Sequence, residues 1–145
     1  MSKIVVTGVD ASETAAVAAR KAAEVASALG ARLHVLSAYG DFEAERINVG
    51  SEEFLVSNEK TAEGVAFDVF AEIRKDFPGL EITYGPAEGA PADALVKAAE
   101  ELNAEVIVVG NKRVQGLARI LGSIARDVAA KAPCDVYVAH THQRG

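Results

Sequence analysis

The sequence predicts a doubly wound α/β domain, in which four helices cover the two faces of a five-stranded parallel sheet. Short apolar runs rich in β-branched residues alternate with longer segments whose apolar residues recur at helical spacing. The 145 residues, half of them hydrophobic, are enough for one domain with one sizeable core. Strict alternation of strands and helices favours parallel strands joined by right-handed crossovers.

The first three elements follow closely on one another. The run from Lys3 to Asp10 is rich in β-branched residues and ends at polar and glycine positions, as expected of a buried strand. Ser12 then opens an amphipathic helix, and Gly30 is suited to ending it in a left-handed conformation. A second strand is expected from Arg32 to Ala38.

The middle of the chain contains the longest predicted helix. A mostly acidic loop from Tyr39 to Ser51 precedes a helix expected from Glu52 to Asp76, whose apolar residues share one face. A Phe-Pro-Gly sequence stops this helix. A short third strand from Leu80 to Tyr84 follows, and then a turn-rich loop from Gly85 to Ala90.

The third helix and the fourth strand have clear boundaries. Pro91 is suited to the first position of the helix, and Asn103 to a left-handed residue at its end. The run from Glu105 to Val109 is apolar in its core, which is typical of a strand buried on both faces.

The last helix and strand complete the pattern. Ser123 is expected to cap a fourth helix, and Pro133 ends it. The fifth strand, from Asp135 to His140, would leave an apolar edge that needs covering. A homodimer through this strand is therefore expected.

Charge and composition exclude several classes of protein. The net charge of −6, from 15 basic and 21 acidic side chains, argues against a broad surface for nucleic acid or anionic membranes. The single cysteine, Cys134, cannot form an intrachain disulfide and is expected to be a small core residue. The chain has neither a signal-peptide pattern nor a stretch of roughly 20 apolar residues, so a cytoplasmic protein is expected.

The ends of the first and fourth strands mark the expected ligand site. Ligands of open α/β sheets bind beyond the carboxyl ends of the strands, where the strand order reverses. If the first three strands wind outward, the fourth must return beside the first. Asp10 and Gly110 then lie at the point of reversal, where the Asp10 carboxylate can accept hydrogen bonds from a ribose or an adenine amino group. Main-chain groups at Ser37 and Ala38 can meet a flat base.

The segment after the fourth strand has the features of an anion site. Gly110 permits close backbone approach, while Gly122 and Ser123 meet the start of a helix, whose free amides and dipole favour an anion. Between Asn111 and Arg126 there are four basic residues and no acidic one, so a phosphate is the natural match. These basic residues are Lys112, Arg113, Arg119 and Arg126.

At this point the chain resembles the universal stress protein family over nearly its whole length. The resemblance rests on GVDASE after the first strand, GAPADAL before the third helix, and VVGNKRVQGLARILGSIARDVAAKAPCDVYV at the end. It implies a Rossmann-like sheet of order 3-2-1-4-5, a single domain over residues 1–145, and ATP as the ligand, with Mg²⁺. Relatives similar to this chain pair through the fifth strand.

The resemblance also implies which residues bind the nucleotide. Asp10 would contact the nucleoside, Ala38 would touch adenine through its backbone, and Ser123 and Ile124 would offer groups to the phosphates. The full set implied is Val9, Asp10, Ala38, Val109, Gly110, Lys112, Arg113, Gly122, Ser123 and Ile124.

The loop departs from the family form, G-x2-G-x9-G-[ST], at two points. Arg113 stands where the family has its second glycine, and the segment from Arg113 to Gly122 is one residue shorter. The Arg113 side chain either crowds the path of the ribose and phosphates or points outward and pairs with a phosphate. Both outcomes stay open from the sequence.

Other site chemistries find no support. Asp10 has the alternative role of capping the first helix, although Ser12 is better placed for it. There is no Walker loop, no GxGxxG after the first strand, and no catalytic triad or paired carboxylates at one strand end. His140 and His142 lack a third ligand, so no protein metal site is expected.

The sequence therefore predicts a cytoplasmic, homodimeric, ATP-binding regulatory protein that responds to stress. No general base is evident near the loop, so at most slow ATP hydrolysis is expected. Nucleotide binding would order the loop and change the surface that an unidentified protein partner meets. Two alternatives remain: a dimeric adaptor that needs no nucleotide, and a protein that binds AMP or a cyclic nucleotide.

Overall fold

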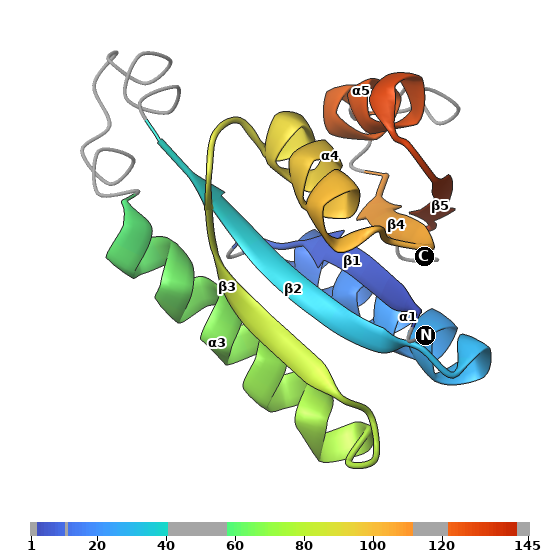
Figure 1. Cartoon of the computed structure of the whole chain (residues 1–145). Helices are drawn as coiled ribbons and strands as arrows, with labels where there is room; N and C mark the ends of the chain where they lie inside the picture. The colour runs from blue at the N-terminus through green and yellow to red at the C-terminus, as the bar shows by residue number, and fades with distance from the viewer. Residues whose placement is uncertain (1–2, 11, 41–57, 112–121, 142–145) are drawn as a thin grey trace.

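The computed structural model describes residues 3–10, 12–40, 58–111 and 122–141. Within these ranges the chain forms five strands and four helices that alternate along the sequence (Figure 1). In chain order they are β1 (Ile4–Gly8), α1 (Glu13–Leu29), β2 (Arg32–Tyr39), α3 (Glu59–Asp76), β3 (Ile82–Glu88), α4 (Pro91–Leu102), β4 (Val106–Gly110), α5 (Ser123–Lys131) and β5 (Asp135–Ala139).

The five strands form one parallel sheet in the order β3-β2-β1-β4-β5. The predicted doubly wound fold and its strand order are confirmed. The direction of winding reverses between β1 and β4, where Thr7 pairs with Val108. The buried hydroxyl of Thr7 also donates a 2.9 Å hydrogen bond to the carbonyl oxygen of Val108, which ties these two strands together.

Two helices cover each face of the sheet (Figure 1). α1 packs on β1 and β4, and α3 packs on β2 and β3. Their core contains Val5, Leu33 and Val35, with a row of alanines from α1. On the other face, α4 and α5 enclose Leu36 and Ile107. Because side chains alternate along each strand, both faces of the central strands are apolar, as expected of a sheet buried between helices.

Most predicted helix ends are confirmed. Ser12 caps α1 by accepting a 3.1 Å hydrogen bond from the Ala15 amide, and Gly30 ends the helix with a φ of 65°. Asn103 ends α4 with a φ of 55°, in the left-handed region that asparagine tolerates best after glycine.

Two predicted boundaries in the middle of the chain differ in the structure. α3 begins at Glu59 instead of Glu52, because Asn58 is extended and its side chain accepts a hydrogen bond from the Thr61 amide. Residues 52–57 lie outside the described residues. β3 runs from Ile82 to Glu88, so most of the expected loop from Gly85 to Ala90 is strand. β2 extends alongside it and provides ladder partners for this longer strand.

Pro86 fits within β3 because this strand lies at the edge of the sheet. The Gly89 amide donates to Tyr39 and the Leu33 amide donates to Glu81, so alternate residues of β3 face β2. Pro86 falls on the opposite, outward side, where a missing N–H breaks no ladder bond. The other strands differ from their predicted bounds by at most two residues.

Candidate functional site

The ends of β1 and β4 meet where the strand order reverses. Val9 and Asp10 follow β1 directly, and Gly110 is the last residue of β4. The Val9 amide donates a 2.8 Å hydrogen bond to the Leu36 carbonyl of β2, so the chain stays in the sheet up to this point. The structure thus brings Asp10 and Gly110 to the same carboxyl edge, as the sequence predicted.

Asp10 shapes the turn between β1 and α1. Its Oδ1 accepts a 2.8 Å hydrogen bond from the Ser12 amide, while the Ser12 hydroxyl caps the helix. Ser12, and not Asp10, is therefore the residue that caps α1. The Asp10 residue is exposed, so its carboxylate is accessible from solvent at the edge of the sheet.

Val9 and Val109 face the interior. They are 7% and 4% exposed, and their side chains belong to the cores on opposite faces of the sheet. Only their main chains can therefore take part in a site at the strand ends. Ala38 is half-buried near the end of β2, opposite Ala87, and packs against the core under α4.

Gly110 lies where neighbouring segments come very close. A Cβ atom at this position would be 3.1 Å from Cγ2 of Thr141 and 3.2 Å from Cβ of Ala18. Ordinary Cβ atoms rarely have contacts this short, so the close approach of β4 to α1 depends on glycine here. Packing therefore favours glycine at this position, and the approach of a ligand to Gly110 stays a prediction.

The start of α5 differs from the prediction in one detail. Gly122, with φ −64° and ψ 163°, occupies the N-cap position, and Ser123 is the first helical residue. Ser123 therefore does not cap α5, and no side chain caps this helix. The amides of its first turn have no partner within the helix, which leaves Ser123 and Ile124, both exposed, at an electropositive helix end.

Asn111 is the residue that the sequence reasoning missed. Its Oδ1 accepts a 2.9 Å hydrogen bond from the Gly122 amide and so joins the end of β4 to the start of α5. A short polar side chain directly after a strand-ending glycine was the available signal. Lys112 and Arg113, which were predicted to bind the nucleotide, lie outside the described residues.

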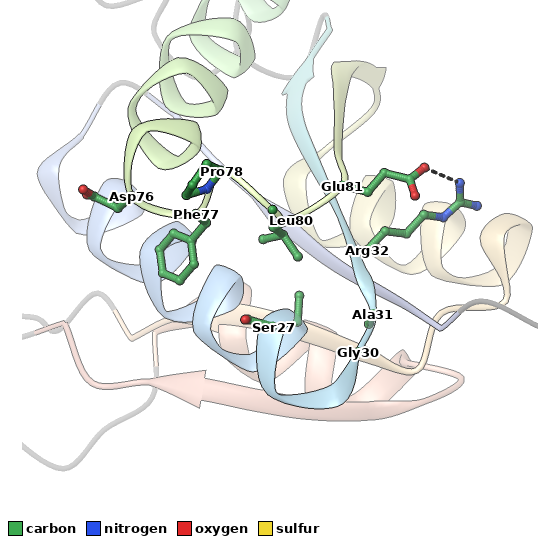
Figure 2. Close-up of a pocket in the computed structure, with 11 residues that line it drawn as sticks. Ser27, Gly30, Ala31, Arg32, Asp76, Phe77, Pro78, Leu80 and Glu81 are labelled. Carbon is green, nitrogen blue, oxygen red and sulfur yellow. Dashed lines mark ion pairs between the residues drawn. The ribbon is translucent and has the colours of Figure 1, made fainter.

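A hollow of about 590 Å³ lies at the other end of the sheet (Figure 2). It is formed by the ends of α1 and α3 and the start of β2, with Ser27, Phe77 and Leu80 among its lining residues. Arg32 and Glu81 also line this hollow and form an ion pair of 3.5 Å. Parallel sheets bind ligands at their carboxyl ends, so this hollow is not the predicted site.

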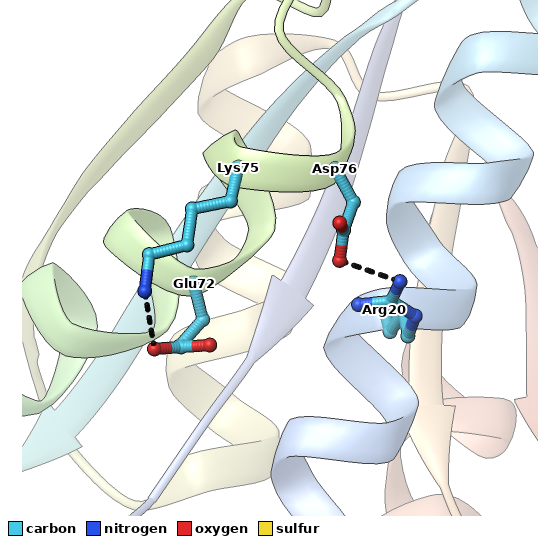
Figure 3. Close-up of polar contacts among 4 residues, drawn as sticks. All are labelled: Arg20, Glu72, Lys75 and Asp76. Carbon is cyan, nitrogen blue, oxygen red and sulfur yellow. Dashed lines mark hydrogen bonds and ion pairs between the residues drawn. The ribbon is translucent and has the colours of Figure 1, made fainter.

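A second hollow, of about 440 Å³, lies between α1 and α3, and Asp10 and Ser12 are among its lining residues. Farther along, Arg20 of α1 donates a 2.6 Å hydrogen bond to Asp76 at the end of α3, and Lys75 contacts Glu72 at 3.3 Å (Figure 3). These pairs are exposed, so they contribute little stability.

The Cys134 thiol is partly buried and lies just before β5, away from the carboxyl ends of β1 and β4. Burial raises the pKa of the Cys134 thiol, with a smaller contribution from Asp135, so this thiol is a poor nucleophile. Cys134 packs against the core under α4 and α5, as expected.

Among the described residues, no cluster of His, Cys, Asp and Glu could hold a metal ion. None of the described helices is long and apolar enough to span a membrane.

Comparison with known proteins identifies the family. Residues 1–140 match the model of the universal stress protein family. The chain belongs to this family. The universal stress protein Rv1636 of Mycobacterium tuberculosis strain H37Rv is 35% identical over 145 residues, which cover 96% of this chain and 97% of the relative.

Solved structures of universal stress proteins are also similar to this one. A universal stress protein in complex with cAMP superposes with a TM-score of 0.72 at 29% identity, covering 97% of this chain and 98% of its own. The Archaeoglobus fulgidus universal stress protein in complex with dAMP gives a TM-score of 0.65 at 27% identity, with 95% and 97% covered.

Proposed function

We propose that this universal stress protein binds ATP, with Mg²⁺, at the carboxyl edge between β1 and β4. The observation that carries the proposal is the placement of an exposed carboxylate, Asp10, and the uncapped start of α5 at the ends of the two strands where the sheet reverses. A carboxylate suits ribose or adenine donors, and an uncapped helix start suits a phosphate. The complexes of two neighbours with cAMP and dAMP support an adenine nucleotide.

Each described residue then has a distinct role. Asp10 accepts hydrogen bonds from the nucleoside, and the main chains of Val9, Ala38 and Val109 surround it. The amides of Ser123 and Ile124 donate to the phosphates. Gly122 supports this helix start with its backbone, although its own amide already donates to Asn111. Lys112 and Arg113 would add positive charge, and the phosphate oxygens of ATP would hold Mg²⁺.

We further propose that the protein is a homodimeric switch that acts in the cytoplasm. Among the described residues, β3 and β5 form the two edges of the sheet. Pro86 interrupts the outward hydrogen-bonding groups of β3. The Asn111 amide donates to the Ala139 carbonyl, so Ala139 faces β4 and Val136 and Val138 turn their main-chain groups outward. An edge without proline is the better surface for pairing with a second copy.

ATP hydrolysis by this protein should be slow at most. Asp10, the carboxylate at the edge between β1 and β4, is held by the Ser12 amide and has been assigned to the nucleoside. A fast ATPase needs a group that activates water in line with the terminal phosphate. The proposed function is therefore regulatory: nucleotide binding changes the surface presented to a protein partner.

A thermal-shift titration tests nucleotide binding. Saturating ATP with Mg²⁺ should raise the melting temperature, because a ligand that binds only the folded state stabilises it. Nucleotide released from the purified, denatured protein would give independent support. Absence of both results would overturn the proposal and favour a dimeric adaptor that needs no nucleotide. The alternative that the protein binds AMP or a cyclic nucleotide is suggested by the cAMP-bound neighbour. Competition of AMP and cAMP with ATP tests this alternative.

A further inference from the structure

We propose that Asn111 is a positioning residue, which holds the start of α5 in place for phosphate binding and links it to the segment after β5. The proposal rests on the proposed function, because it assigns a role within the same nucleotide site. Asn111 is not among the residues proposed to contact the nucleotide. It acts through three of its own polar atoms, each of which hydrogen-bonds to a different residue.

The side-chain bond fixes the helix start. Asn111 Oδ1 accepts from the Gly122 amide at 2.9 Å across a separation of 11 residues in sequence, and the bond is partly buried. α1 and α3 are capped by serine and asparagine side chains at their own N-cap positions, whereas the N-cap of α5 is a glycine. Asn111 therefore satisfies the first amide of this helix start and leaves those of Ser123 and Ile124 for an anion.

The two main-chain bonds connect Asn111 to the fifth strand. Its amide donates to the Ala139 carbonyl at 3.2 Å, and its carbonyl accepts from the Thr141 hydroxyl at 3.1 Å. Among the described residues, Asn111 therefore hydrogen-bonds both to the end of β5 and to the helix start. This geometry links occupancy of the phosphate site to the edge at which a second copy is proposed to pair.

Mutations at Asn111 and Thr141 separate positioning from general stability. Asn111→Ala removes the acceptor for the Gly122 amide, and Thr141→Val removes the hydroxyl while keeping the branched shape of the side chain. Thr141→Ser keeps the hydroxyl and should restore wild-type binding. Asn58→Ala is the matched control, since Asn58 makes the same kind of bond, 3.0 Å to the Thr61 amide, at the start of α3.

Two measurements are needed on each variant. The first is ATP affinity by calorimetry, which should fall about tenfold in Asn111→Ala and about threefold in Thr141→Val, as expected for the loss of one hydrogen bond. The second is the rate at which the Gly122 amide proton exchanges with water, measured by NMR without nucleotide. That rate should rise in Asn111→Ala and stay at the wild-type value in Asn58→Ala.

The outcomes distinguish this inference from the proposed function. Failure of the wild-type protein to bind ATP overturns the proposed function. If the wild type binds ATP and Asn111→Ala binds it equally well, the positioning role is wrong. An unchanged Gly122 exchange rate in Asn111→Ala overturns it without any nucleotide. If Asn111→Ala does not fold, the comparison of Thr141→Val with Thr141→Ser decides, and equal affinities count against the link.

Discussion

Gly110 and Thr141 lie so close that a Cβ atom on Gly110 would stand 3.1 Å from the Thr141 methyl group. Thr141 cannot easily rotate away, because its hydroxyl donates to the Asn111 carbonyl. The Cβ atom of Ala18 closes the other side at 3.2 Å. The end of β4 is therefore packed tightly between α1 and the segment after β5.

Gly110→Ala should lower the free energy of unfolding by about 1 kcal/mol or more, since overpacking forces the backbone or its neighbours to shift. Urea denaturation measures this effect. ATP affinity should fall as well, because the shift displaces Asn111. Wild-type stability in this variant would show that the neighbours of Gly110 move apart at little cost.

Gly64→Ala should have the opposite effect on stability. Gly64 lies inside α3, and a Cβ atom there would meet nothing within 4 Å. Alanine is favoured over glycine in a helix interior by about 1 kcal/mol, so the free energy of unfolding should rise by about that amount. Urea denaturation alongside Gly110→Ala makes the two variants a matched pair. A lower stability would contradict the packing described for α3.

Substitutions at Asp10 and Ser12 should distinguish ligand binding from helix capping. Ser12→Ala removes the cap of α1 and should cost about 1 kcal/mol of stability while leaving ATP affinity near the wild-type value. Asp10→Ala should weaken ATP binding more strongly than Ser12→Ala. Calorimetric titration with ATP and denaturation of both variants provide the comparison. Equal affinities in both variants would remove Asp10 from the site.

Val136→Pro should convert the proposed dimer into a monomer. Proline removes the outward N–H of Val136 and leaves the groups that face β4 intact, as Pro86 does at the opposite edge. Light scattering at micromolar concentration measures the molecular mass. Pro86→Ala, at the other edge, is the control and should stay dimeric. A wild-type protein that is monomeric under these conditions would disprove dimerisation through β5.

His34 should contribute to the pH dependence of stability. Burial, and then the positive charge of Arg32, lower the pKa of His34 from its ordinary value of 6.5, and its Nδ1 lies 2.7 Å from the Thr83 hydroxyl. Below pH 6.5 the unfolded chain binds this proton more readily than the folded one. The free energy of unfolding should therefore fall as the pH decreases from 6.5 through the folded-state pKa.

His34→Gln should flatten that dependence, because glutamine can still hydrogen-bond to Thr83 but does not titrate. Urea denaturation between about pH 8 and about pH 5 measures the slope. An equal slope in His34→Gln and the wild type would show that other groups control stability in this range.

Sequence reasoning was accurate where the signal is local, and failed where it depends on tertiary context. Asp10 and Gly110 could be placed together because both follow apolar runs, and the ends of parallel strands share one edge. The length of β3 was wrong because glycine and proline at positions 85 and 86 resemble a turn. In the fold, β2 pairs along this segment, and the edge position accommodates the proline.

The sequence by itself determined the alternation of strands and helices, the parallel sheet, the reversal between β1 and β4, and the family. Each of these depends on periodicity, turn residues or motifs that lie within a few positions of one another. Only the tertiary structure decided that Gly122 occupies the N-cap position of α5, that Asn111 satisfies the Gly122 amide, and that Thr141 packs against Gly110. Those contacts join residues distant in sequence, and they depend on how closely β4, α5 and the segment after β5 pack together.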